Sequence, residues 1–130
     1  MPRVVHFEMH ALDPERAIAF YEAVFGRKFA AWGGPPGMYW LVTTGAELEP
    51  GIQGGLVKRP GRVPTDGQAV NGNACTVAVD NVDAMHEAIE ARGGVPALPE
   101  QAIPGVGWLV YCKDSKGNIV ELMQNDPTAR

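Results

Sequence analysis

Polar and apolar residues alternate along residues 4–10, VVHFEMH, which predicts a β-strand near the start of the chain. Successive side chains of a strand point to opposite faces, so His6, Glu8 and His10 are expected on one face. The apolar residues between them are expected on the other face. The predicted strand therefore has one apolar face and one face with titratable side chains.

A helical pattern follows this strand. Asp13 is a residue type that caps helix N-termini, and Pro14 suits the first helical position. Gly26 stands where a helix often ends in left-handed backbone. The apolar residues between these positions recur with helical spacing at Ala17, Phe20, Tyr21 and Val24. The pattern predicts a helix that turns these four side chains toward the core.

The rest of the chain alternates between strand-like segments and turns rich in glycine and proline. Three strands are expected after the helix, at residues 28–32, 38–43 and 51–58. The segment 59–73, RPGRVPTDGQAVNGN, has the composition of a linker. Beyond it the order repeats, with a strand at 74–79, a helix from the cap Asn81 to Gly93 and Gly94, strands at 95–98, 108–112 and 119–124, and a loose tail at 125–130.

A sequence echo supports the same organisation. PGMYWLV at residues 36–42 returns as PGVGWLV at residues 104–110, an offset of 68 positions with five of seven residues identical. A fixed offset of this kind indicates a fold that is built twice. We therefore predict an α+β fold of two tandem βαβββ modules, related by a pseudo-twofold axis, whose partly closed mixed sheet surrounds a central cavity. Residues 1–130 are expected to form one domain, with module one at about 1–58, a linker at 59–73, module two at 74–124 and a tail at 125–130.

Composition narrows the functional classes. The apolar content of 45% and charged content of 20% are typical of a globular protein. A net charge of −4 and the lack of a basic stripe argue against a nucleic-acid partner. No apolar run reaches the roughly 18 residues of a membrane helix, and the first residues lack a hydrophobic signal core, so we expect a cytoplasmic protein without a membrane partner. Cys75 and Cys112 are too few for a disulfide framework.

Several sequence features occur together. They are the βαβββ repeat, the spacing from His6 to Asp13, the helix residues Arg16, Ala17, Phe20 and Tyr21, and the ending Asp114, Gly117, Asn118, Glu121 and Leu122. Together they resemble the vicinal oxygen chelate superfamily, which contains glyoxalases, bleomycin resistance proteins and extradiol dioxygenases. The stretches HFEMHALDPERA, ACTVAVDNVDA and IPGVGWLVYCKDSKGN are similar to a glyoxalase-like subgroup of mostly unassigned activity. The resemblance implies a small-molecule ligand. We also expect a homodimer, and the two modules pair either within one chain or by a swap between two chains, since both arrangements occur in the superfamily.

The resemblance implies a divalent metal in the cavity, either zinc, nickel, manganese or iron, that binds vicinal oxygens of the substrate. Carried over to this sequence, the first-strand ligand is His6 and the last-strand ligand is Glu121. The 68-residue offset assigns Gln53 to the last-strand position of module one. The fourth position is usually histidine, and here it is Ala74, which has no donor atom. The expected metal set is therefore His6, Glu121 and Gln53, and it is incomplete.

The same side chains have interpretations without a metal. His6 can be a hydrogen-bonded residue that lines the cavity. Glu121 needs a metal, an arginine, a hydrogen-bond cluster or His6 itself as its partner, because a buried carboxylate is costly alone. Glu8 shares the face of His6 and is a candidate catalytic base together with Glu121, or else lies at a solvated edge. His10 and His86 are expected at the surface.

Two tryptophans stand at equivalent positions of the repeat, Trp40 and Trp108. They either pack in the core around the pseudo-axis or line the cavity and stack on a flat ligand. In the second interpretation they are the candidate ligand-binding residues.

Two functions follow from these assignments. The first is a metal-dependent lyase or isomerase of the glyoxalase type, which moves a proton alpha to a carbonyl with Glu121 or Glu8 as the base. The alternative is a metal-free protein that binds and sequesters a small aromatic or amphipathic molecule, as resistance-type members of the superfamily do. A metal-free enzyme or regulatory subunit is a third hypothesis. Ala74 favours the metal-free functions, whereas the presence of both His6 and Glu121 favours a working site.

Overall fold

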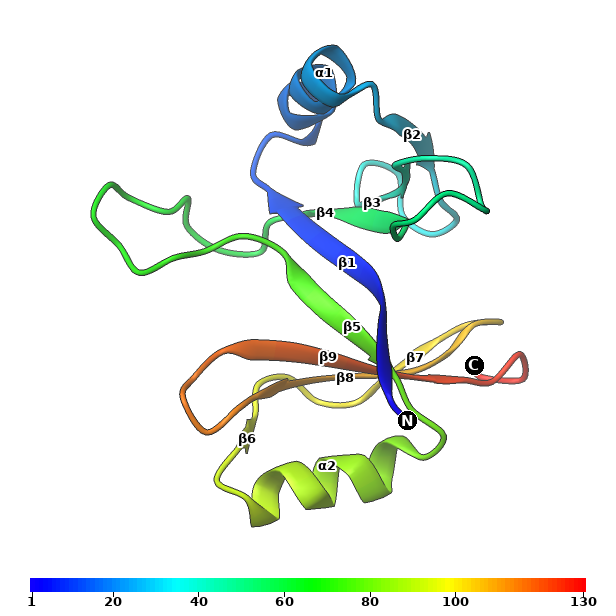
Figure 1. Cartoon of the computed structure of the whole chain (residues 1–130), viewed down its shortest axis with the longest axis vertical. Helices are drawn as coiled ribbons and strands as arrows, with labels where there is room; N and C mark the ends of the chain where they lie inside the picture. The colour runs from blue at the N-terminus through cyan, green and yellow to red at the C-terminus, as the bar shows by residue number, and fades with distance from the viewer. The chain divides into compact units, whose positions relative to one another are not determined.

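The computed structural model describes residues 1–130 and divides them into two compact units. The N-terminal unit is His6–Asn73, and the C-terminal unit consists of Met1–Val5 together with Ala74–Arg130. In both units a strand is followed by a helix and then by at least three strands (Figure 1). The predicted α+β fold of two βαβββ modules is confirmed.

The element bounds follow the predicted order closely. The first half contains β1 (Arg3–Ala11), α1 (Pro14–Phe25), β2 (Lys28–Ala31), β3 (Tyr39–Thr43) and β4 (Gly54–Lys58). The second half contains β5 (Ala74–Ala78), α2 (Val82–Ala91), β6 (Val95–Pro96), β7 (Gln101–Ile103), β8 (Gly107–Lys113) and β9 (Ile119–Asn125). Strand β1 crosses the boundary, because its first residues group with the C-terminal unit. Neither helix has the length and apolar character that crossing a bilayer requires.

In the N-terminal unit the strand order is β2-β3-β4-β1. Strand β1 runs parallel to β4, and the other neighbouring strands are antiparallel. Helix α1 covers one face of these strands, and the core lies between helix and sheet. The buried core residues are Phe7, Met9, Val42 and Leu56, packed against Ala17, Ile18 and Tyr21 of α1.

The strand register assigns every side chain of this sheet to a face. Phe7 pairs with Gly54 and points to the core, so the next pair, Glu8 with Gly55, points the opposite way. Leu41 pairs with Gly55 and shares its face. We call the face that the helix leaves uncovered the helix-free face. In this unit it includes His6, Glu8, His10, Tyr39, Leu41 and Gly55.

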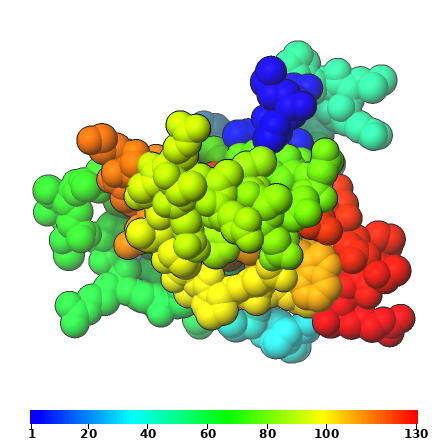
Figure 2. All heavy atoms as spheres, turned by 90° about the horizontal axis from the view of Figure 1, so that it is seen from below, coloured from blue at the N-terminus to red at the C-terminus, as the bar shows by residue number.

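In the C-terminal unit the strand order is β5-β9-β8-β6, and β7 also pairs with β8. Helix α2 covers one face of this sheet, and Figure 2 views the molecule from the side of α2. The core beneath α2 consists of Val79, Val82, Val110, Cys112 and Leu122, with Met85 and Ile89 of the helix packed against it. The register places Thr76, Tyr111 and Glu121 side by side on the helix-free face of this unit.

Both helix starts are capped as predicted. The side chain of Asp13 accepts a hydrogen bond from the Arg16 N–H at 3.2 Å, and that of Asn81 accepts one from the Ala84 N–H at 2.9 Å. Helix α1 ends at Gly26, whose φ of 66° is the left-handed conformation expected there. The 68-residue offset therefore aligns equivalent helix caps.

The predicted apolar stripe of α1 is partly wrong. Ala17 and Tyr21 pack on the sheet, but the third contact comes from Ile18. Phe20 and Val24 are 55% and 56% exposed. Helical spacing gives the width of an apolar stripe but not the angle at which the helix docks, and here the core-facing line is rotated toward Ile18.

Three features of the C-terminal unit differ from the prediction. Strand β7 was not expected, and β6 has only two residues. The tail is not loose, because Ala129 is buried and its carbonyl accepts a hydrogen bond from the Gly105 N–H at 3.0 Å. Figure 2 shows these C-terminal residues in red beside the orange segment of the same unit. A polar terminal segment gives no sequence signal for such backbone docking.

Candidate functional site

His6 and Tyr39 meet on the helix-free face of the N-terminal unit. Nε2 of His6 and Oη of Tyr39 form a hydrogen bond of 3.2 Å, with its direction set by the imidazole tautomer. Burial lowers the pKa of His6 from its ordinary value, and the nearby carboxylate of Glu8 offsets part of that shift. The lowered pKa favours the neutral imidazole, which is suited to hydrogen bonding. Tyr39 was not among the sequence candidates.

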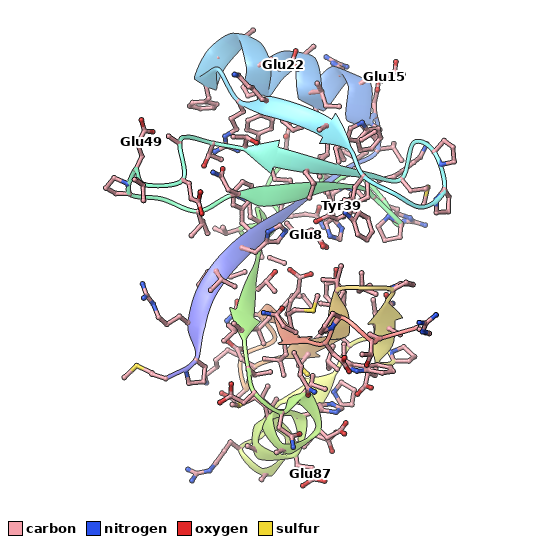
Figure 3. The ribbon with its side chains drawn as sticks, turned by 90° about the vertical axis from the view of Figure 1, so that its right-hand side faces the viewer. Glu8, Glu15, Glu22, Tyr39, Glu49 and Glu87 are labelled. Atoms are coloured by element: carbon pink, nitrogen blue, oxygen red, sulfur yellow. The ribbon has the colours of Figure 1, made fainter.

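A glycine makes room for this tyrosine. A Cβ on Gly55 would overlap the hydroxyl end of the Tyr39 ring. The ring therefore lies across β4, from its own strand β3 to His6 on β1. Figure 3 shows Tyr39 and Glu8 together on the side of the sheet away from α1. Glu15 and Glu22 mark α1 on the other side. Gly55, one of the two glycines that weaken the strand signal in the sequence, serves this packing.

Glu8 is buried, with 5% of its surface exposed, and His10 contacts it. Oε1 of Glu8 lies 2.8 Å from Nε2 of His10. A carboxylate only accepts hydrogen bonds, so the imidazole donates its N–H. Glu8 therefore does not lie at a solvated edge, and its role as a catalytic base stays a prediction. The expectation that His10 is a plain surface residue also needs correction, because His10 is half-buried beside this carboxylate.

Gln53 is turned toward its own loop. Its Oε1 accepts hydrogen bonds from the Thr44 N–H at 2.6 Å and from the Thr44 hydroxyl at 3.2 Å. Its amide nitrogen donates to the Gly45 carbonyl at 2.8 Å. Both ends of the amide therefore hold the β3–β4 connection together, and the residue is exposed.

Glu121 lies in the C-terminal unit and is 1% exposed. The hydroxyl of Thr76, on the neighbouring strand β5, donates a hydrogen bond of 2.9 Å to its Oε2. Tyr111 pairs with Glu121 in the register of β8 and β9. Of the partners proposed for Glu121 from the sequence, the structure thus provides a hydrogen-bond cluster. Ala74 begins β5 and shares the face of Thr76.

The two tryptophans of the repeat lie on the helix-covered faces. Trp40 packs against the core of the N-terminal unit, and Trp108 against that of the C-terminal unit. The indole N–H of Trp108 also donates to Asp126 at 3.0 Å. The tryptophan on a helix-free face is Trp32, which follows β2 and contacts Tyr39 edge to face at 5.6 Å.

These observations test whether the donors fit a divalent metal. Gln53 uses its amide oxygen within the loop, His6 shares its Nε2 with Tyr39, and position 74 has no donor atom. Within neither unit do three or more His, Cys, Asp or Glu side chains form a group able to hold a metal ion. Stable transition-metal sites need three or four well-oriented nitrogen, sulfur or carboxylate ligands. The residues present do not fit that requirement.

Sequence comparison identifies the family. The sequence profile of the Glyoxalase/Bleomycin resistance protein/Dioxygenase superfamily matches residues 3–122. The chain belongs to this superfamily. The match covers both βαβββ units of the superfamily member and confirms the resemblance inferred from its motifs. No curated protein resembles the chain closely enough in sequence to count as a relative.

Solved structures agree on the fold. A methylmalonyl-CoA epimerase in complex with methylmalonyl-CoA and ammonium has a TM-score of 0.65 at 16% identity, over 99% of this chain and 98% of that one. The methylmalonyl-CoA epimerase of Mycobacterium tuberculosis has a TM-score of 0.62 at 18% identity, over 95% and 88% of the two chains. A Bacillus halodurans protein has a TM-score of 0.63 at 11% identity, over 99% and 98%. At these identities the likeness shows a common fold.

Proposed function

We propose that this superfamily member binds small molecules at the helix-free face of a βαβββ unit and does so without a divalent metal. The observation that carries the proposal is the state of the expected metal donors. Gln53 is held by Thr44 and Gly45, and alanine stands at position 74, where the family resemblance implies a histidine. His6 hydrogen-bonds to Tyr39. The side chains that were expected to bind the metal, His6, Gln53 and Glu121, thus form hydrogen bonds within the protein.

The distribution of buried polar groups supports a binding site on these faces. The buried polar residues of the chain are Glu8, Thr76 and Glu121, and all three belong to helix-free faces. Burying a carboxylate is costly unless it accepts hydrogen bonds, so an unused face would favour apolar residues there. On the face of its own unit, each of the two carboxyl groups favours a ligand that donates hydrogen bonds.

The metal-dependent lyase or isomerase acting alpha to a carbonyl remains the competing function. The presence of His6 and Glu121 at their family positions favours it, and it would need a metal that the donor set does not support. Glu8 and Glu121 stay the candidate bases if the protein is an enzyme. We keep the homodimer and the cytoplasmic location as parts of the proposal, the first to be checked by light scattering after gel filtration.

A metal measurement separates the two functions. Protein purified without chelator is analysed for metal by mass spectrometry and then titrated with nickel, zinc and manganese. We expect well below one metal per chain and no saturable binding. A stoichiometric metal that is lost in His6→Ala would overturn the metal-free proposal and support the lyase or isomerase.

A ligand screen tests binding itself. Thermal-shift assays with a small-molecule panel should identify compounds that raise the melting temperature, since a ligand at 100 times its Kd stabilises a protein by about 2.7 kcal/mol. Glu121→Gln should reduce the shift, whereas Glu87→Gln, on the exposed surface of α2, should not. A panel without a single binder, or shifts that ignore Glu121→Gln, would contradict the proposal.

A further inference from the structure

Trp32 and Tyr39 form a continuous aromatic surface on the helix-free face of the N-terminal unit. The backbone N–H of Trp32 donates a hydrogen bond to the backbone carbonyl of Tyr39 at 3.2 Å, so the two residues are direct cross-strand partners. Their ring centroids are 5.6 Å apart with an interplanar angle of 67°. This edge-to-face contact fixes the indole against the tyrosine ring.

We call this surface of Trp32 and Tyr39 the wall. It runs from an exposed end at Trp32 to a polar end at His6. Trp32 is 38% exposed and belongs to neither hydrophobic core. The Tyr39 ring continues from it across Gly55 and reaches His6 with its hydroxyl. Leu41, which pairs with Gly55, is 44% exposed on the same face. Apolar surface at Trp32 and Leu41 thus leads to polar groups at His6.

Glu8 lies at the polar end, where its Oε1 accepts a hydrogen bond from Nε2 of His10 at 2.8 Å. Glu8 pairs with Gly55 in the register and is buried next to the tyrosine ring. A buried carboxylate attracts hydrogen-bond donors and repels anions, and the effect is strong where water is scarce. The same groups would tolerate a neutral hydroxyl or amine on a ligand.

We propose that the wall of Trp32 and Tyr39 binds the ring of a planar aromatic molecule whose polar end, directed toward His6 and Glu8, is a hydrogen-bond donor and not an anion. This inference rests on the proposed small-molecule binding and adds the ligand class. A purely structural role would require only that Tyr39 cover Gly55. It would give no reason for an indole that leaves the core and keeps more than a third of its surface exposed.

Three probes with the same ring test the ligand class. Fluorine NMR titrations of the full chain use para-fluorophenol, para-fluorotoluene and para-fluorobenzoate, which differ only in the polar end. We expect para-fluorophenol to bind about threefold or more tighter than para-fluorotoluene, the effect of one net hydrogen bond. Para-fluorobenzoate should bind weakest. Equal affinities, or tightest binding of the benzoate, would overturn the assignment of the polar end.

Variants test the wall. Trp32→Leu should weaken para-fluorophenol by about fivefold or more, since aromatic pairs contribute beyond their buried area. Trp32→Phe should recover part of the loss. Tyr39→Phe, which keeps the ring, should selectively weaken para-fluorophenol and leave para-fluorotoluene unchanged. The matched control is Phe20→Leu, which removes an exposed aromatic ring of the same unit from α1.

The outcomes separate this inference from the proposed function. If screened ligands bind and depend on Glu121 but ignore Trp32→Leu and Tyr39→Phe, the wall is overturned and small-molecule binding stands. If nothing in the broad screen binds, the proposed function fails first. A change of oligomeric state in Trp32→Leu, with unchanged probe affinity, would mean that a second copy covers the indole and would also overturn the wall.

Discussion

The ring of Tyr39 lies over Gly55, where any other residue would carry its Cβ. The register explains the contact, because Gly55 faces the same side of the sheet as Leu41 of β3 and Glu8 of β1. Gly54 serves the Phe7 ring in the same manner on the core side. Two adjacent glycines thus let two aromatic rings cross one strand on its opposite faces.

Gly55→Ala should displace Tyr39 from His6. The new methyl group meets the hydroxyl end of the ring, which can swing away, so we expect a stability loss of about 1 kcal/mol or less, at the low end of overpacking. The His6 ring resonances in NMR should shift as the hydrogen bond breaks. Gly61→Ala is the control, because nothing lies within 4 Å of a Cβ there. An unchanged His6 spectrum in Gly55→Ala would contradict the packing.

Thr76→Val should destabilise the C-terminal unit. It removes the hydroxyl that donates to Oε2 of the buried Glu121 at 2.9 Å. Loss of a hydrogen bond to a buried charged group costs about 1–3 kcal/mol. Urea unfolding should show a lower midpoint for Thr76→Val and a near-normal one for Thr76→Ser, which keeps the donor. Equal stability of the valine and serine variants would argue against the bond.

Arg27→Met should loosen the end of α1. The guanidinium carbon lies 4.9 Å from the Tyr21 ring centroid and 5.5 Å from that of Phe25. Cation–π contacts of this kind contribute about 0.5–2 kcal/mol, and methionine keeps the chain length without the charge. Thermal melts should show a lower midpoint than for Arg62→Met, which removes an exposed loop charge. Equal midpoints for the two variants would show that the charge at Arg27 contributes nothing.

Acid stability should depend on the turn after β8. The side-chain and backbone N–H groups of Asn118, with the Lys116 N–H, hold the pKa of Asp114 below its ordinary 3.8. A folded-state pKa below the unfolded one stabilises the fold above the unfolded value. That contribution is lost as the pH falls from about 3.8 through the lower folded value. Asp114→Asn should therefore flatten the acid limb of a stability–pH curve, and an unchanged limb would count against this role.

Much of the fold follows from local sequence signals. The caps Asp13 and Asn81, the end of α1 at Gly26 and the succession of helices and strands along the chain were predictable because each depends on residues that are neighbours in the chain. The extra strand β7 and the docked tail were not, since they depend on partners elsewhere, as in the bond from Gly105 to Ala129. The echo itself also contains a hidden difference. Tyr39 aligns with Gly107 across the 68-residue offset.

The candidate site shows the same division. Alternation in the strands put His6, Glu8 and His10 on one face, and the structure agrees. The sequence also indicated that Ala74 leaves the family's metal set incomplete. It did not indicate that Gln53 binds its own loop, because that depends on the path of the β3–β4 connection.

The sequence alone determined the family, the two βαβββ units, and the residues missing from a metal site. Only the tertiary structure decided which face of each sheet the helix covers. That choice placed Trp40 and Trp108 in the cores and left Trp32 and Tyr39 beside His6. The physical reason is that alternation assigns side chains to two faces but does not determine which face the helix covers. Packing decides that, between segments as far apart in the chain as His6 and Tyr39, which are 33 residues from each other.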